Sequence, residues 1–257
     1  MTAITTAPQW IRLLGGLVTV FALFHLSARA LGSDRGQAGI AVAVLVVTAT
    51  LAIERLVFGQ RLASAARSLG FGRPAARGVV AAVAICVALL LVVPAYARIS
   101  EARMSFFPGW WWLLPGLFAQ GGIAEEVLFR GYLFGRIRRG RSFWHAAGLS
   151  MLPFAAVHLL LFFTMPWPIA LAALLLSVVL SIPFAHLFEV GGGTVWGPAL
   201  VHFVCQATVK VVAFPDTAVF PLVWMLASAV IPLAVLLVPR RGSRGDAERH
   251  SADPTAP

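Results

Sequence analysis

The sequence predicts an all-α protein, a polytopic transmembrane helical bundle of about eight spans with both termini in the cytoplasm. Three observations lead to this prediction. Hydrophobic residues make up 60% of the 257 residues and charged residues only 12%, about half the charge content of an average soluble protein. Apolar blocks long enough to cross about 30 Å of hydrocarbon recur along the chain. Arginines gather in alternate connections between those blocks.

The predicted spans are separated by short connections. They cover residues 9–31, 37–54, 76–98, 110–136, 143–164, 167–188, 194–214 and 219–238. Trp167, in the turn between the fifth and sixth spans, can anchor that turn at the membrane interface. The first span ends in Ser27-Ala28-Arg29-Ala30, a pattern that also fits a cleaved signal peptide. We expect an uncleaved span, because its apolar run is long and only Arg12 precedes its core.

Arginine placement sets the predicted orientation. The connection after the second span contains Arg55, Arg61, Arg67, Arg73 and Arg77. The connection after the fourth span contains Arg136, Arg138, Arg139 and Arg141. The segment after the eighth span contains Arg240, Arg241, Arg244 and Arg249. The connections after the first, third and fifth spans hold two arginines at most. The positive-inside rule therefore places both termini and the arginine-rich segments in the cytoplasm. We expect a membrane domain over residues 1–239 and a short disordered cytoplasmic tail over 240–257.

The net charge of +10 does not indicate nucleic-acid binding, because the basic residues only separate apolar blocks and no aromatic or glycine-rich platform lies beside them. Cys86 and Cys205 lie inside apolar segments without metal-type spacing. We expect them to be small buried hydrophobic residues rather than a disulfide. The expected surroundings are a lipid bilayer, and the expected location is the cell membrane with several passes.

Charged residues inside the fourth span point to chemistry. Glu125 and Glu126 lie side by side in an apolar stretch, and Arg130 follows them. A charged side chain at the middle of a bilayer costs at least about 2.5–3.5 kcal/mol, so such residues are functional by default. Glu126 and Arg130 share a helix face, which favours an ion pair. Glu125 points about 100° away and is expected to face a polar cavity. The alternative is an ion-pair cluster that only locks helices together.

Two further spans bring polar side chains to the membrane interior. His158 lies in the fifth span, and His202 lies in the seventh with Gln206 four residues later on the same face. A single buried histidine is more often an interhelical hydrogen-bonding residue than a ligand. Together with Glu125, however, the two histidines could form a hydrolytic centre. They could hold Zn²⁺ as a His/His/Glu site, or position a water directly with Glu125 as the general base.

Other titratable residues are weaker candidates. We expect His25 of the first span to contact a neighbouring helix or to reach the interface. His186 and Glu189 close the sixth span and are expected mainly at the membrane interface.

The chain resembles, at these residues, the CAAX prenyl protease and bacteriocin-processing family of intramembrane endopeptidases. The family carries three motifs on successive helices, E-E-x-x-x-R, F-x-x-x-H and H-x-x-x-N. The matching residues in this sequence are Glu125, Glu126 and Arg130, then Phe154 and His158, then His202. Gln206 stands where the family usually has asparagine. The resemblance covers roughly residues 105–215.

The resemblance implies an activity and a set of roles. Family members cleave peptide bonds near the cytoplasmic membrane face, and some release a C-terminal tripeptide from prenylated proteins. By position, Glu125 and His158 would activate the attacking water. His202 and Gln206 would stabilise the oxyanion, although the additional methylene of glutamine is expected to displace its amide relative to asparagine. The residues implied to support the site are Glu126, Arg130 and Phe154.

We therefore expect an intramembrane endopeptidase that acts on membrane-associated peptides or prenylated protein tails reaching it from the cytoplasmic side. The alternative is a non-catalytic membrane scaffold or immunity-type protein that binds a peptide in the same cavity. A third class is a proton-coupled transporter that uses Glu125 and the histidines as a relay, although the chain shows no internal repeat and no inverted pair of broken helices.

Overall fold

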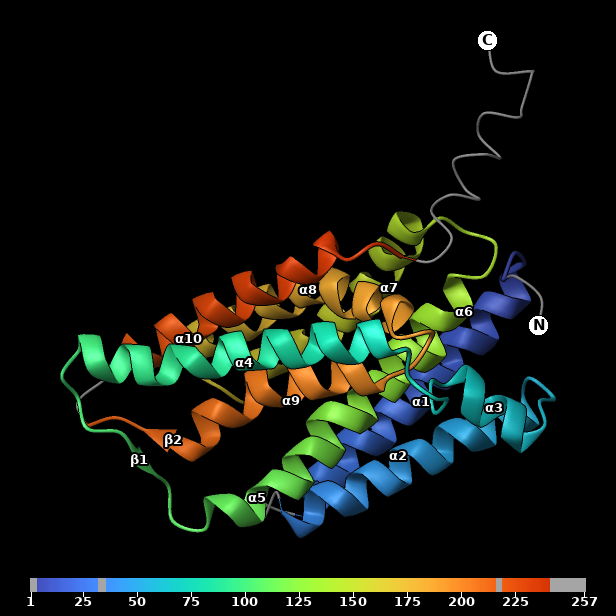
Figure 1. Cartoon of the computed structure of the whole chain (residues 1–257). Coiled ribbons are helices and arrows are strands. Elements are labelled where there is room, and N and C mark those ends of the chain that lie inside the picture. Colours follow the sequence, from blue (N-terminus) through green and yellow to red (C-terminus); the bar gives the residue numbers. More distant parts are fainter. Residues whose placement is uncertain (1–3, 32–35, 216–218, 241–257) are drawn as a thin grey trace.

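The computed structural model describes residues 4–31, 36–215 and 219–240. Residues 241–257 of the expected tail lie outside the described part. Within the described part the chain forms an elongated bundle of helices with one short pair of strands (Figure 1). The predicted all-α fold is confirmed.

Six of the described helices are long and apolar enough to cross a membrane, and they correspond to six of the predicted spans. They are α1 (Ala7–Ala30), α2 (Gln37–Leu56), α4 (Ala76–Ile99), α7 continued by η3 (Phe143–His158 and Leu159–Phe163), α8 (Trp167–Val190), and α10 continued by η4 (Val219–Val230 and Ile231–Leu237). A short helix, α3 (Leu62–Ser68), lies in the first arginine-rich connection. The chain is therefore a multi-pass helical membrane protein.

The other two predicted spans are also helical, but each departs from a regular spanning α-helix. Residues 110–137 alternate between α and π turns as α5 (Trp110–Leu117), η1 (Phe118–Ala124), η2 (Val127–Phe134) and α6 (Gly135–Ile137). The second, α9 (Trp196–Val211), has 16 residues, fewer than the roughly 20 that a spanning helix needs. That both segments cross the bilayer stays a prediction. Together they carry most of the candidate site residues, and π turns are frequent at functional sites.

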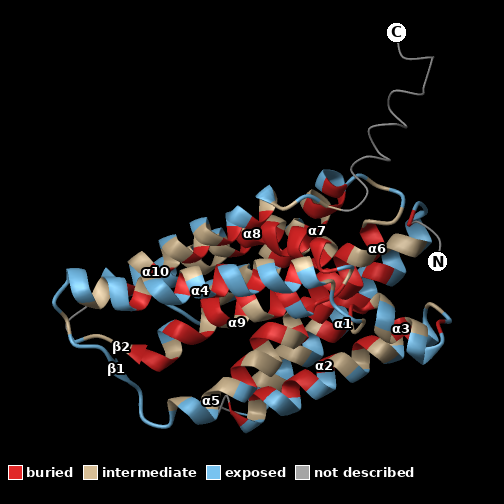
Figure 2. Ribbon diagram, viewed as in Figure 1, coloured by how far each residue is buried: buried red, intermediate tan, exposed pale blue. Residues whose placement is uncertain are grey.

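Large apolar side chains cover the outside of the bundle as well as its core. Leu26 of α1, Val80 and Leu91 of α4, and Leu175 of α8 are all exposed. Figure 2 shows exposed residues along the outer faces of the helices and buried residues where the helices meet. Monomeric soluble proteins rarely expose apolar patches of this kind. The outer faces are suited to lipid, in which helices satisfy their own backbone polar groups.

Glycines allow residues 110–137 to approach neighbouring backbones closely. A Cβ atom on Gly39 of α2 would lie 2.5 Å from the carbonyl oxygen of Gly116 in α5. A Cβ atom on Gly131 of η2 would lie 2.3 Å from the carbonyl oxygen of Leu69, just after α3. Such approaches are sterically possible only without a side chain. These contacts fix both ends of the segment that contains the two adjacent glutamates.

A buried ion pair also holds this segment. Glu54 of α2 and Arg136 of α6 are both buried, and Arg136 Nε donates to Glu54 Oε1 at 2.9 Å. Arg136 Nη2 and Gln60 Nε2 both bind the second carboxylate oxygen of Glu54. The guanidinium of Arg136 lies over the ring of Phe58. Sequence analysis did not single out Glu54, although it lies at the end of a predicted span.

The bundle has two chemically different ends. Helices α3 and α6 and the arginine-rich connections lie at one of them, here called the arginine-rich end. Strands β1 (Ser105–Phe106) and β2 (Val212–Ala213) pair antiparallel at the other, here called the strand end (Figure 1). The positive-inside rule predicts a cytoplasmic location for the arginine-rich end. That orientation stays a prediction.

Candidate active site

Glu125 and Glu126 occupy the junction between the two π-helical stretches η1 and η2. Because η1 packs against α9 and α2, both glutamates lie in the interior of the bundle. Glu126 is fully buried, whereas the Glu125 side chain keeps 17% of its surface exposed. Glu125 lines a cavity of about 370 Å³, here called the polar cavity. The two neighbours therefore face different surroundings, as the sequence predicts.

Glu126 is the centre of a buried cluster of charged and polar groups. Its Oε1 accepts a hydrogen bond from Arg130 Nη1 at 3.0 Å and lies 2.7 Å from His202 Nδ1. The ion pair with Arg130 confirms the prediction from their spacing, while the contact with His202 was not predicted. Since a carboxylate only accepts, His202 donates from Nδ1. Glu126 thereby sets both the orientation and the tautomer of that imidazole.

Aromatic rings hold Arg130 on its other faces. Its guanidinium carbon lies 4.3 Å from the ring centroid of Phe154 and 5.1 Å from that of Phe184. Cations are attracted to the faces of aromatic rings, most strongly where water is excluded. Arg130 itself is buried. Phe154, the first residue of the second motif, therefore supports the charge cluster directly.

His158 ends α7, at the point where the helix tightens into the 3₁₀ turn η3. Its Nδ1 lies 2.8 Å from the backbone oxygen of Phe154. Because a carbonyl oxygen only accepts, Nδ1 carries the hydrogen in this contact. The imidazole lines the polar cavity together with Glu125. Nε2 is then the ring nitrogen left to bind a water or a substrate.

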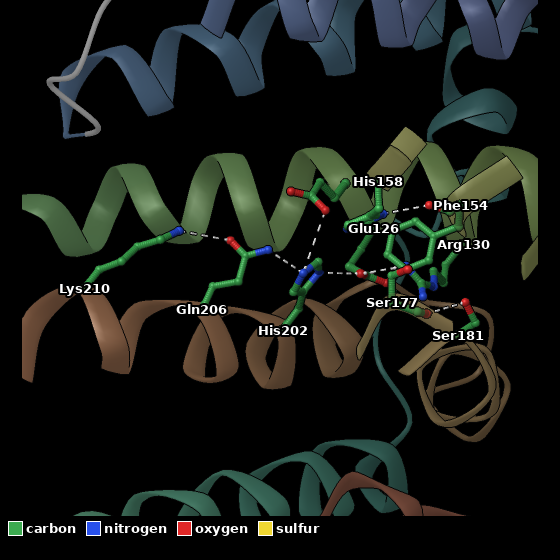
Figure 3. A network of polar contacts seen from close by, with 10 residues as sticks. Glu126, Arg130, Phe154, His158, Ser177, Ser181, His202, Gln206 and Lys210 are labelled. Carbon is green, nitrogen blue, oxygen red and sulfur yellow. Dashed lines mark hydrogen bonds and ion pairs between the residues drawn. The ribbon is translucent and has the colours of Figure 1, made fainter. Parts of the chain in front are cut away.

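Helix α9 brings His202 and Gln206 to the polar cavity. His202 Nε2 lies 3.7 Å from Glu125 Oε2 and 2.6 Å from Gln206 Nε2. With its Nδ1 hydrogen directed at Glu126, a neutral His202 accepts a hydrogen bond from the Gln206 amide at Nε2. The amide of Gln206 thus reaches the histidine, so the additional methylene does not separate the two groups (Figure 3).

Sequence analysis missed two residues that line the polar cavity. His25 of α1, expected at a helix contact or the interface, lines the cavity instead. Lys210 of α9 also lines it, and its Nζ lies 3.4 Å from Gln206 Oε1. Figure 3 shows Lys210, Gln206 and His202 in a row along one face of α9. A signal for Lys210 was present in the sequence, because it is the only lysine in the chain and follows Gln206 by four residues.

Two weaker candidates lie elsewhere. His186 Nε2 contacts the backbone oxygen of Val238 at 2.8 Å. Glu189 pairs with Arg138 and lies 3.6 Å from Arg240 Nη1. Neither His186 nor Glu189 lines the polar cavity. Both instead tie the end of α8 to the arginine-rich end of the bundle.

The exposed part of the polar-cavity lining lies toward the strand end. Thr164 and Met165, both exposed, belong to the turn between η3 and α8. Lys210 lies in the last turn of α9, and His25 lies near the end of α1. All four positions lie in or just after helices that run away from the arginine-rich end (Figure 1). Entry of the substrate from the cytoplasmic side stays a prediction.

A larger cavity, of about 800 Å³, lies between α4, α5 and α9. Its lining is apolar apart from Arg98 and Thr208. No acid or imidazole of the described residues contributes to that lining. Size alone therefore does not identify the site. The smaller polar cavity is the one lined by acid and imidazole side chains.

The donor atoms do not form a zinc site in this arrangement. No group of three or more histidine, cysteine, aspartate or glutamate side chains in the described ranges could hold a metal ion. Glu126 and Gln206 engage the two ring nitrogens of His202. Glu125, His158 and His202 therefore do not present the three ligands that a catalytic zinc requires. A metal requirement stays a prediction.

Fold and site together define a multi-pass helical membrane protein with glutamate and histidine side chains around one interior cavity. Residues 107–208 match the family model described as type II CAAX prenyl endopeptidase, Rce1-like. This segment is similar to that family, and the resemblance inferred from the three motifs is confirmed for it. Comparison with curated proteins and with solved structures gave no match.

Proposed function

We propose that this protein is a CAAX-type endopeptidase of the cell membrane that hydrolyses peptide bonds of membrane-associated peptides or prenylated protein tails. One observation carries the proposal. Glu125, His158, His202 and Gln206 come from three separate helical segments and line one cavity of about 370 Å³. Donors and dipoles arranged in advance in such an enclosure stabilise developing charge far better than water does. The family match over residues 107–208 supports a proteolytic use of the cavity.

Glu125 is the proposed general base. Glu126 makes the ion pair with Arg130, and Glu125 retains exposed surface in the cavity. Glu125 takes a proton from a water, whose oxygen then attacks the scissile carbonyl carbon. His158 holds the same water through Nε2, because its Nδ1 is occupied by Phe154. A positioned general base typically contributes about 10²–10⁴-fold to the rate.

His202 and Gln206 are the proposed oxyanion donors. The Gln206 amide has N–H groups to offer. In this step His202 is protonated, so it donates from both ring nitrogens and no longer accepts from Gln206 at Nε2. Nδ1 then remains on Glu126 while Nε2 binds the oxyanion. The tetrahedral intermediate collapses when Glu125 returns its proton to the leaving nitrogen and the carbon–nitrogen bond breaks. Removing one oxyanion donor typically lowers kcat by roughly 10²–10³-fold.

Cleavage in proteoliposomes tests the proposal. The probes are two fluorescence-quenched peptides that share one sequence and end in a free carboxylate, one with a farnesylated cysteine and one with the unmodified cysteine. We expect the wild type to cleave the farnesylated peptide. Glu125→Gln and His158→Ala should lower kcat by about 10²-fold or more. Glu101→Gln is the matched control, because Glu101 is exposed and lies outside the polar cavity.

Equal cleavage by wild type and Glu125→Gln would contradict the proposed mechanism. If no variant cleaves either peptide, but wild type and Glu125→Gln bind the farnesylated peptide equally well, a peptide-binding scaffold explains the site better than a protease does. Uptake driven by a pH gradient in the same proteoliposomes would instead indicate a transporter.

A further inference from the structure

The larger cavity, of about 800 Å³, has no role in the proposed hydrolysis. Sites that enclose a small ligand typically measure about 300–1,000 Å³, so this cavity has the volume of a binding site. Helix α9 separates it from the polar cavity. His202 and Gln206 line the polar cavity from one face of α9, whereas Phe203, Ala207 and Val211 line the larger cavity from another. A ligand in the larger cavity would therefore lie behind the helix that carries both proposed oxyanion donors.

The lining of the larger cavity extends along the helix axes. On α4 it runs from Leu90 to Arg98, and on α9 from Phe203 to Val211. Eight positions separate the ends of each stretch, which corresponds to about 12 Å along an α-helix. One leaflet contributes half of the hydrocarbon core, or about 15 Å. The cavity therefore has nearly the length that one leaflet provides for a lipid chain.

The lining carries its charge at one end. Arg98 is the one charged side chain among the described residues of this lining, and it is exposed in the last turn of α4. In the part of the chain that the structure describes, no hydrogen bond or ion pair engages its guanidinium. The hydroxyl of Thr208 donates to the backbone oxygen of Val204 at 2.9 Å. The cavity is thus apolar along its length and cationic at the strand end.

Aromatic side chains indicate the depth of that end in the membrane. Phe106 and Trp110 line the cavity beside Arg98, and their stacked rings have centroids 4.8 Å apart. Trp111 and Trp112 follow and are exposed. Tryptophan is enriched at the level of the lipid headgroups, and arginines near the ends of spanning helices reach the same level. The cationic end of the cavity is therefore suited to a headgroup, and the apolar length to an acyl chain.

We propose that the larger cavity binds a phospholipid of the surrounding bilayer with an anionic headgroup. One acyl chain lies between α4, α5 and α9, and the phosphate pairs with the guanidinium of Arg98. A guanidinium matches phosphate oxygens with two parallel hydrogen bonds. In a zwitterionic lipid the headgroup's own cation neutralises the phosphate, so an anionic lipid is favoured. This lipid site lies outside the proposed active site, and the inference does not depend on the proposed function.

Lipid binding to the purified protein in a nonionic detergent tests the charge at Arg98. The probes are phosphatidylglycerol and phosphatidylcholine with the same two acyl chains, and native mass spectrometry measures both affinities. We expect the wild type to bind phosphatidylglycerol about tenfold more tightly. That is the lower end of the range for hydrogen bonds to charged groups, because Arg98 is exposed. Arg98→Met should bind the two lipids about equally.

Arg29→Met is the matched control for the loss of one positive charge. Arg29 is exposed in the last turn of α1, another helix long and apolar enough to span the membrane, and it lines neither cavity. Like Arg98, it complements the carboxyl end of a helix dipole. Its lipid preference should equal that of the wild type. An equal fall in both variants would mean that anionic lipid only follows the net charge of the protein, which would overturn the assignment.

A second pair of variants tests the cavity itself. Ala97 lines the larger cavity, whereas Ala95, two positions earlier in α4, is exposed and lines neither cavity. Ala97→Phe should weaken the binding of both lipids severalfold, and Ala95→Phe should leave it unchanged. Unchanged binding in Ala97→Phe would overturn the proposal. Tighter binding of uncharged N-acetyl-S-farnesylcysteine amide than of phosphatidylglycerol would also overturn it, because the cavity would then belong to a prenyl group.

Discussion

The Glu126 carboxylate has no exposed surface, so its charge depends on the groups that touch it. Arg130 supplies the compensating charge at 3.0 Å. Removing one partner of a buried ion pair typically costs about 3–5 kcal/mol, because the other charge stays buried and unpaired. We therefore expect Arg130→Met to lower the free energy of unfolding by that amount, measured by thermal or denaturant unfolding in detergent.

A double variant separates the loss of the ion pair from the loss of side-chain packing. In Glu126→Gln/Arg130→Met neither buried charge remains, and part of the lost stability should return. Arg73→Met is the matched control, because Arg73 is exposed in the arginine-rich connection, and it should be nearly neutral. If Arg130→Met unfolded like Arg73→Met, Arg130 could not be the compensating charge of Glu126.

Gln206 allows a second prediction at the residue scale. Leucine keeps nearly the same volume and removes both hydrogen-bonding groups of the amide. We expect Gln206→Leu to lower kcat by roughly 10²-fold with a smaller change in KM, since the donor acts on charge that develops in the transition state. Gln206→Asn should lie between Gln206→Leu and the wild type, because it keeps the amide on a shorter side chain. Gln37→Leu, at an exposed position of α2, is the control.

Sequence analysis located the site residues that lie on short local patterns. The spacing of Glu126 and Arg130 predicts their ion pair, and that of His202 and Gln206 predicts a shared helix face. Both are confirmed by contacts of 3.0 and 2.6 Å. The bond between Glu126 and His202 could not be predicted, because 76 residues separate them and only helix packing brings them together. Lys210 was missed because a single lysine near a helix end has an ordinary explanation in the helix dipole.

At the scale of elements, the boundaries of the long spans were predictable, whereas the π turns were not. Apolar length predicts a span at 110–136, but no local pattern distinguishes α from π hydrogen bonding. The π geometry arises where the segment fits between α2 and α9. It places Glu125 and Glu126 between η1 and η2, so the polar cavity depends on this irregularity.

Helix α1 offers the sharpest test of element packing. Gly15 and Gly16 are neighbours in that helix, yet a Cβ on Gly16 would lie 2.2 Å from Tyr132 Oη, whereas one on Gly15 would meet nothing within 4 Å. Tyr132 is buried and donates to the backbone oxygen of Leu13 at 3.1 Å, so it has no room to move.

We expect Gly16→Ala to lower stability by about 1–3 kcal/mol through overpacking. Gly15→Ala should be neutral or slightly stabilising, because alanine favours the helix. Thermal unfolding of the purified variants measures both changes. Equal effects would mean that α1 does not pack on η2 as described.

At the scale of the whole molecule, the arginine clusters and the exposed lining of the polar cavity lie toward opposite ends of the bundle. The arginine clusters predict a cytoplasmic location for α3 and α6. The exposed lining of the polar cavity, including Thr164 and Met165, lies toward the strand end. The substrate is expected to enter from the cytoplasm, and that expectation stays a prediction. The exposed lining favours entry at the strand end, so the side of the membrane on which that end lies decides whether the substrate enters from the cytoplasm.

Cysteine labelling on intact cells tests this orientation. Thr164 and Arg73 are both exposed, at the strand end and the arginine-rich end respectively. Both native cysteines are buried, so the unmodified protein provides a low background. A membrane-impermeant maleimide should label Thr164→Cys on intact cells, and label Arg73→Cys only after the membrane is opened. The opposite pattern would place the cavity opening in the cytoplasm.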